Sequence, residues 1–259
     1  MRTLVEMVAR CGPAGRTVLP VVRASGQLAV RRTGPETVHL VATAFGPLGG
    51  DDAEIRIVVE AGARLNVRSV AAAVVLPARG ESPPSRQVVH AEVAGLLDLR
   101  PEPTVVTARA EHRAELRALL SGDGQLYAAE QVLLGRTGEK PGRWTGTTRI
   151  ERDGLPVLHT TIGLGPGAPA WLPPVAPVAH ASAVSLGTVD GVGVLPGQDA
   201  VRLPLPGGWV STAWGLELPD TVARLTALDR PVVGAPFAES GLPVRRHAVA
   251  RAAAAEVTR

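Results

Sequence analysis

The run Thr43-Ala-Phe-Gly-Pro-Leu-Gly-Gly-Asp51, followed by the alternating segment Glu54-Ile-Arg-Ile-Val-Val-Glu60, indicates a β fold. Two consecutive glycines can both adopt positive φ, as the tight turns that match strand twist require, and Gly46-Pro47 is a second turn signal. We therefore expect a hairpin turn between two strands that lie close together, ended by Asp51. On local grounds alone, this aspartate is as readily a backbone cap of the turn as a functional carboxylate.

The same alternation continues along the chain. Apolar and polar residues alternate again over 64–68, after a turn at Ala61-Gly62, and the stretches 88–99 and 104–111 follow the same pattern. This predicts a mainly β protein: stacked antiparallel hairpins and sheets that form one elongated β-rich domain over residues 1–259. Two helices are expected in the C-terminal part, near 220–228 and 245–257, and the Gly/Pro-rich segment 164–177 is the one plausible flexible segment.

Composition excludes several classes of protein. With 29 glycines, 23 prolines and 45% hydrophobic residues, the 259-residue chain suits many short elements joined by turns. The net charge is only +3, acidic and basic residues are interspersed, and aromatic residues make up 3%, so nucleic acid is a poor candidate partner. Without a long apolar segment or a signal-peptide pattern, and with Cys11 as the single cysteine, we expect a soluble cytoplasmic protein that does not enter membranes.

Common catalytic motifs are missing from the sequence. The only lysine, Lys140, lies between Glu139 and Pro141, so there is no phosphate-binding Gly-Lys-Ser/Thr loop. Gly-x-Ser-x-Gly and His-Glu-x-x-His are also absent. Each histidine taken alone is more often a surface or core residue than a metal ligand; the six are His39, His90, His112, His159, His180 and His247.

Residues 154–189 contain no Asp, Glu, Lys or Arg, but prolines and glycines interrupt the segment too often for a membrane helix. Two interpretations remain open. The segment is either a buried crossover with its apolar residues in the core or an exposed apolar surface that binds a partner.

Several short motifs in order give the chain a family resemblance. These motifs are Gly26-Gln-Leu-Ala-Val-Arg31, the Gly49-Gly50-Asp51 turn, Ala61-Gly-Ala63, Leu99-Arg-Pro101-Glu-Pro103, and Glu130-x4-Gly135-Arg136 with Gly138-Glu139. Over about residues 16–165 the chain thereby resembles the UreD (UreH) family of urease accessory proteins.

The resemblance implies a non-enzymatic chaperone or scaffold of urease maturation. Such a protein binds apo-urease and a UreF-like partner, which recruits a UreG-like GTPase, and it holds no tight cofactor but passes Ni²⁺ transiently through an internal water-filled passage. By motif position, Asp51 and Glu130 match residues thought to line that passage. Gly49, Gly50, Gly135, Arg136 and Glu139 match structural positions, with Arg136 expected to anchor a carboxylate such as Glu139.

The chain departs from the family pattern in two places. It has Arg68-Ser-Val-Ala-Ala-Ala-Val-Val75 where relatives usually carry a polar stretch and a lysine, and His159-Thr160 where they often have an acidic residue. We therefore expect a less acidic passage, with His159 as a candidate nickel-contacting group beside Asp51 and Glu130. Spaced single carboxylates suit a conduit, because a closed cage of ligands would trap the ion.

Two other functions remain open from the sequence. The first is a β-rich metal-dependent hydrolase that uses Asp51, Glu130 and His159 as metal ligands. The second is a pure interaction scaffold that binds a partner through the 154–189 surface and passes no metal.

Overall fold

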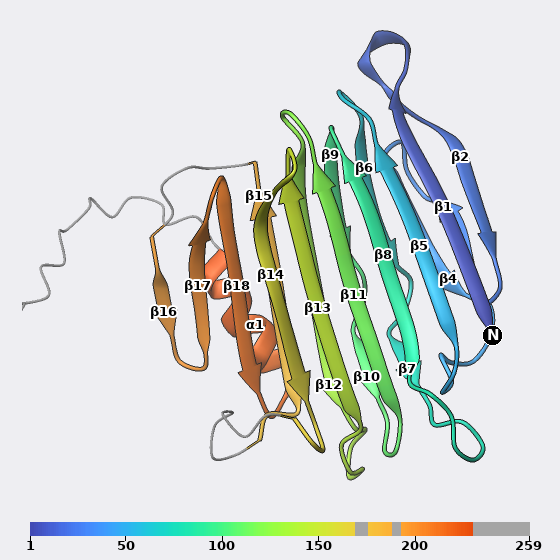
Figure 1. Cartoon of the computed structure of the whole chain (residues 1–259), viewed down its shortest axis with the longest axis vertical. Coiled ribbons are helices and arrows are strands. Elements are labelled where there is room, and N and C mark those ends of the chain that lie inside the picture. The colour runs from blue at the N-terminus through green and yellow to red at the C-terminus, as the bar shows by residue number, and fades with distance from the viewer. Residues whose placement is uncertain (169–175, 188–192, 230–259) are drawn as a thin grey trace, which may run out of the picture. The chain divides into compact units, whose positions relative to one another are not determined.

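Two facing β-sheets make up most of the structure, a computed structural model that describes residues 1–168, 176–187 and 193–229 (Figure 1). Sheet A has seven strands, in the order β14 (Leu155–Leu164), β13 (Arg143–Arg152), β11 (Glu111–Leu120), β8 (Ser85–Val93), β5 (Asp52–Val59), β1 (Arg2–Cys11) and β2 (Thr17–Ser25).

Sheet B has eleven strands. Nine of them form a continuous path: β16 (Leu195–Gly197), β17 (Ala200–Leu205), β18 (Gly208–Gly215), β15 (Ala179–Leu186), β12 (Gln125–Leu134), β9 (Leu96–Arg100), β6 (Arg64–Ser69), β4 (Thr37–Ala42) and β3 (Leu28–Arg32). The short strand β10 (Thr104–Val106) pairs with β12, and β7 (Ala73–Val75) pairs with β10.

The centre of each sheet is parallel, because the chain passes repeatedly from one sheet to the other. After β4 in sheet B it enters β5 in sheet A, then β6 in sheet B, β8 in sheet A, and so on through β13. Strands β1, β5, β8, β11 and β13 consequently pair in parallel, as do β4, β6, β9 and β12.

The prediction of a mainly β protein is confirmed, but the expected antiparallel hairpins are wrong for the central strands. Alternation of apolar and polar residues shows that one face of a strand is buried and does not show the direction of its neighbour. The turn at Gly49-Gly50-Asp51 was expected to join two strands of one hairpin. It instead connects β4 and β5, which belong to different sheets. Antiparallel pairing occurs toward the edges of the sheets, for example between β1 and β2 and between β13 and β14.

Two glycines allow successive connections between the sheets to stack closely. A Cβ built on Gly95 would lie 2.3 Å from the carbonyl oxygen of Ala63, and one on Gly124 would lie 2.1 Å from that of Val93. Both distances are far below van der Waals contact. Any side chain at these corners would force the parallel strands apart.

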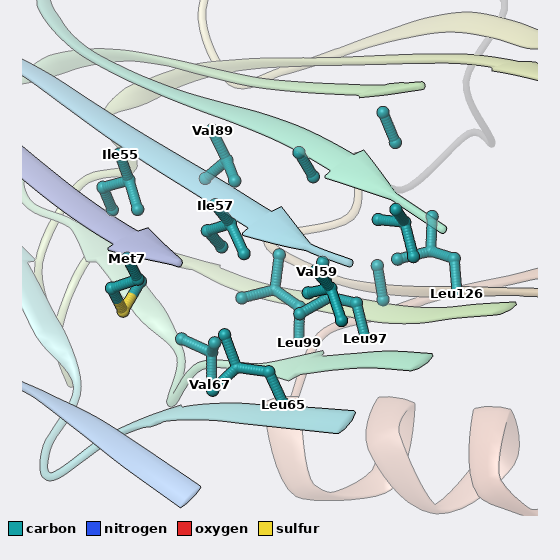
Figure 2. Close-up of a cluster of buried hydrophobic side chains, with 14 of the residues drawn as sticks. Met7, Ile55, Ile57, Val59, Leu65, Val67, Val89, Leu97, Leu99 and Leu126 are labelled. Atoms are coloured by element: carbon teal, nitrogen blue, oxygen red, sulfur yellow. The ribbon is translucent and has the colours of Figure 1, made fainter. Parts of the chain in front are cut away.

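The main hydrophobic core lies between the two sheets. Figure 2 shows Ile55, Ile57 and Val59 from β5 on one side, with Leu65 and Val67 from β6 and Leu97 and Leu99 from β9 on the other. Each of these side chains is at most 7% exposed. The alternating residues that predicted strands are therefore the ones that join the sheets.

The charge-free segment 154–189 has two different environments. Strand β14 is an edge strand of sheet A and is largely exposed or half-buried, whereas β15 lies inside sheet B and is almost fully buried. Residues 169–175, in the middle of the predicted flexible segment 164–177, are outside the described residues. The described part thus contains a core strand and an edge strand.

One α-helix, α1 (Leu218–Asp229), follows the strands and covers part of sheet B. Its Leu225 packs into a cluster with Ala183 of β15 and Ala213 of β18. This helix agrees with the one predicted near 220–228, and the one predicted near 245–257 lies outside the described residues. Residues 1–229 form one compact unit, and a single domain over 1–259 stays a prediction. Within the described residues, no helix is long and apolar enough to cross a membrane.

Candidate functional site

Two adjoining cavities lie between the sheets, each with a volume of about 240 Å³. The first extends to Asp51 and the second to His180. They have four lining residues in common: Gln87, Pro101, Ala114 and Glu130. Asp51 therefore lines the first cavity, His180 lines the second, and Glu130 lines both.

The cavities exist because one inward-facing row of sheet A carries small or polar side chains. Across neighbouring strands the paired residues are Thr3, Ala53, Gln87, Ala114 and Gly146. Two positions further along the same strands, the paired residues are Val5, Ile55, Val89 and Leu116. Close-packed interiors leave space only where side-chain volume is missing. The small side chains of the first row therefore account for the cavities.

Asp51 immediately precedes β5 and is 7% exposed. Its carboxylate accepts hydrogen bonds from the amino group of Met1, from the backbone N–H of Leu48 (2.8 Å) and from Nε2 of Gln27 (2.8 Å). Burial alone would raise the pKa of Asp51, but these donors together lower it. The carboxylate is therefore an anion at neutral pH, and its bond to Leu48 is the backbone cap expected for this turn.

Glu130 is a carboxylate inside the protein that has no partner among the described residues. It follows Leu126 and Ala128 and precedes Val132 on the core-facing side of β12. In the described part of the chain its side chain has no hydrogen bond or ion pair. The side chain keeps some accessible surface because it borders both cavities, and burial raises its pKa to about 7. It can consequently lose or gain a proton at physiological pH.

His112 lines the first cavity from β11 and is 3% exposed. Its Nδ1 lies 2.9 Å from Oγ of Ser85, the residue paired with it on β8. Burial lowers the pKa of His112 to about 4, so the imidazole is neutral at physiological pH.

His180 lines the second cavity and lies between two tryptophans. Its ring centroid is 5.5 Å from that of Trp144 and 6.2 Å from that of Trp214, and its Nε2 is 3.1 Å from Oγ1 of Thr212. Its Nδ1 and the two indole Nε1 atoms are buried with no partner among the described residues. Buried polar groups of this kind are ordinarily satisfied by water, so the cavity suits water or a hydrated ion.

His159 lines neither of these two cavities. It is exposed on β14, paired with Arg149 of β13, while the next residue, Thr160, faces the second cavity. The predicted set of Asp51, Glu130 and His159 is therefore not gathered into one site. Among the described residues, no group of three or more His, Cys, Asp or Glu side chains could hold a metal ion.

Three of the predicted structural residues, Gly135, Arg136 and Glu139, lie in a turn after β12, whereas Gly49 and Gly50 belong to the turn before β5. Gly135 and Gly138 have positive φ angles of 80° and 75°. Arg136 donates from Nε and Nη2 to the carboxylate of Glu139, at 3.0 and 3.2 Å. The side-chain hydrogen bonds from Arg136, followed by the one from its backbone N–H, lower the pKa of Glu139 to about 2. Arg136 thus anchors Glu139, as expected, and does not pair with Glu130.

Comparison with known proteins decides the family. The family model for the UreD urease accessory protein matches residues 4–253, nearly the whole chain. The chain belongs to the UreD family.

Individual UreD proteins are similar over most of their length. A urease accessory protein UreD of Frankia alni is 41% identical over 221 residues, which cover 75% of this chain and 74% of the relative. One from Parafrankia is 38% identical over 247 residues, covering 90% and 81%. Membership of the UreD family supports a role in urease maturation.

Sequence reasoning missed His112, His180 and Gln87 as residues of the UreD interior. A signal was present for Glu130, since alternation with Leu126, Ala128, Val132 and Leu134 places it on the buried face of its strand. No local signal separates His112 or His180 from the exposed His159. Their position depends on which strands become neighbours.

Proposed function

We propose that this protein is a non-enzymatic chaperone of urease maturation that delivers Ni²⁺ to apo-urease through the two cavities between its sheets. It acts as a scaffold, binding apo-urease and a UreF-like accessory protein, and it reaches a UreG-like GTPase through that complex. Ni²⁺ is cargo and is bound only transiently.

The observation that carries this proposal is the carboxylate of Glu130, which has no partner among the described residues and lines both cavities. A buried carboxylate without a partner is costly for the fold, and such a group is expected where it serves a function. At the near end of the first cavity, Asp51 provides a second, permanently ionised carboxylate. Two single carboxylates along cavities with a mostly apolar lining can attract a hydrated cation without enclosing it.

Release of the cation follows from the same arrangement. Nickel held by one carboxylate and water can move on, whereas three or four protein ligands would form a stable site. The described residues contain no such cluster. Because the pKa of Glu130 is about 7, its proton competes with the cation near neutral pH and weakens binding further.

The test is nickel loading of urease by variants of the two carboxylates. We expect Asp51→Ala and Glu130→Ala to leave the accessory complex assembled and to lower the nickel content of the urease it activates. Asp52→Ala is the matched control, since Asp52 is next in sequence but pairs with Arg86 and has a side chain that is 46% exposed. Normal nickel loading in both Asp51 and Glu130 variants would exclude the conduit.

The hydrolase alternative is less well supported by the geometry. Its three proposed ligands do not converge, because His159 is exposed on β14 whereas Asp51 and Glu130 line the interior. Blocking the cavities with a bulky side chain distinguishes the conduit from a pure scaffold that passes no metal.

A further inference from the structure

His112 is a buried polar side chain that the proposed function leaves unused. It lines the same cavity as Asp51: Asp51 precedes β5, and His112 is on β11, two strands further across sheet A. Neighbouring strands are about 4.8 Å apart, so the two residues are separated by about 10 Å. Glu130 lines the same first cavity from sheet B.

The hydrogen bonds around Ser85 assign the proton of the imidazole. The Ser85 hydroxyl donates its only hydrogen to the carbonyl oxygen of Glu111, at 3.3 Å. With this assignment of the hydroxyl hydrogen, Oγ accepts from Nδ1–H of His112, at 2.9 Å, in the tautomer protonated at Nδ1. The lone pair is consequently on Nε2, which has no hydrogen-bond partner in the described part of the chain.

This is the arrangement that metal-binding histidines have. One ring nitrogen is fixed by a neighbouring polar group, which sets the tautomer and the ring orientation, while the other presents its lone pair to the ion. Ser85 is fully buried, so its hydroxyl is not available as a nucleophile and serves to position the ring.

We propose that Nε2 of His112 is a nickel ligand in the first cavity and makes this cavity select borderline divalent cations over Mg²⁺. Imidazole nitrogen binds Ni²⁺, Co²⁺, Cu²⁺ and Zn²⁺ well, whereas Mg²⁺ prefers oxygen ligands and keeps its water. Carboxylates alone would admit the far more abundant Mg²⁺. The inference rests on the proposed conduit and adds a selective step to it.

The substitution that tests the inference is His112→Asn. The asparagine amide can still donate to Ser85 but has no group at the position of Nε2. A matched control is His39→Asn, because Nδ1 of His39 also bonds a hydroxyl, that of Thr33 at 2.8 Å, and His39 lines none of the described cavities. Ser85→Ala keeps the imidazole and removes only the group that orients it.

Two measurements on the full-length chain give the readout. Binding of Ni²⁺ is titrated with and without excess Mg²⁺, and X-ray absorption at the nickel edge reports imidazole ligands. For the wild type we expect Ni²⁺ binding that excess Mg²⁺ does not displace, with an imidazole signature. His112→Asn should lose that signature and Mg²⁺ resistance, Ser85→Ala should bind Ni²⁺ about tenfold more weakly, and His39→Asn should behave as the wild type.

The inference is overturned if bound nickel in the wild type shows no imidazole, or if His112→Asn keeps both signature and affinity. If His112→Asn does not fold, the wild-type spectrum and Ser85→Ala still decide the question. Failure of the conduit itself would appear separately, as normal urease loading by the Asp51 and Glu130 variants whatever the spectrum of bound nickel.

Discussion

The carboxylate of Glu130, on β12 of sheet B, reaches across the interior to Gly146, on β13 of sheet A. Oε2 of Glu130 lies 3.2 Å from the position that a Cβ on Gly146 would occupy. The ring of Trp144 is even closer to that position, at 2.2 Å. Gly146 is therefore the place where the absence of one methyl group leaves room for both side chains.

Gly146→Ala should disturb the route at its junction. The new methyl group must displace the Trp144 ring or the Glu130 carboxylate, at a cost of about 1–3 kcal/mol of unfolding free energy. Urea denaturation measures this loss, and nickel loading should fall with it. Gly34→Ala is the control, since a Cβ there would meet its nearest atom, on Thr37, at an ordinary 3.4 Å. Equal stability of the two variants would contradict the close contact.

Glu130→Gln should stabilise the apoprotein at alkaline pH. The pKa of Glu130 is raised from 4.5 to about 7 in the fold, so the folded state binds more protons than the unfolded state between these values and loses stability as pH rises. At pH 8 the substitution should add up to about 3 kcal/mol of unfolding free energy, and at pH 5 under about 1 kcal/mol. Urea titrations at both values measure the difference, with the exposed Glu92→Gln as the control.

The two buried histidines should make the stability of the fold decrease as the pH falls, opposite to the effect of Glu130. Burial lowers the pKa of His112 and of His180 from 6.5 to about 4, so the unfolded state binds more protons in this window and stability is lost as pH falls. Two histidines outweigh the single Glu130 there. His180→Gln retains an amide that can bond Thr212 and removes one titrating group. The change in stability between pH 6.5 and 4 should decrease by up to about 3 kcal/mol; an unchanged slope would show that His180 is protonated in the fold.

Ala114→Phe should separate a conduit from a scaffold. Ala114 lines both cavities where they adjoin, so a phenyl ring there fills the route. We expect the accessory complex to assemble and nickel loading of urease to fall. Arg113→Phe adds the same ring on the outer face of the same strand, at a side chain that is 61% exposed, and should load nickel normally. Full loading by Ala114→Phe would favour the scaffold without metal passage.

The sequence predicted which residues form the core more reliably than how the strands are arranged. Alternation placed Ile55, Ile57 and Val59 on one buried face, and the structure has them there. In the parallel register, Glu54 lies beside Val88. The chain passes through the other sheet once between these two residues. No local pattern encodes this pairing, because it depends on how each connection crosses between sheets.

The candidate site was predictable only where a short motif marks it. The Gly-Gly-Asp turn fixed Asp51, and the Gly-Arg motif located Glu130. His112 and His180 have no such motif, and Gly146 differs from other glycines only because Trp144 and Glu130 converge on it from two different sheets. His159 was wrongly placed among the interior residues. Its side chain is exposed, and the side chain of the next residue along β14, Thr160, faces the cavity.

The small side chains along one row of sheet A have a consequence for the proposed passage of an ion. Because the space comes from missing side-chain volume and not from separated strands, every backbone hydrogen bond of the two sheets can stay in place while cargo moves between them. Passage then needs no opening of the fold. It needs only rotation of a few side chains and exchange of water, and a single bulky residue acquired by mutation could end it without unfolding the protein.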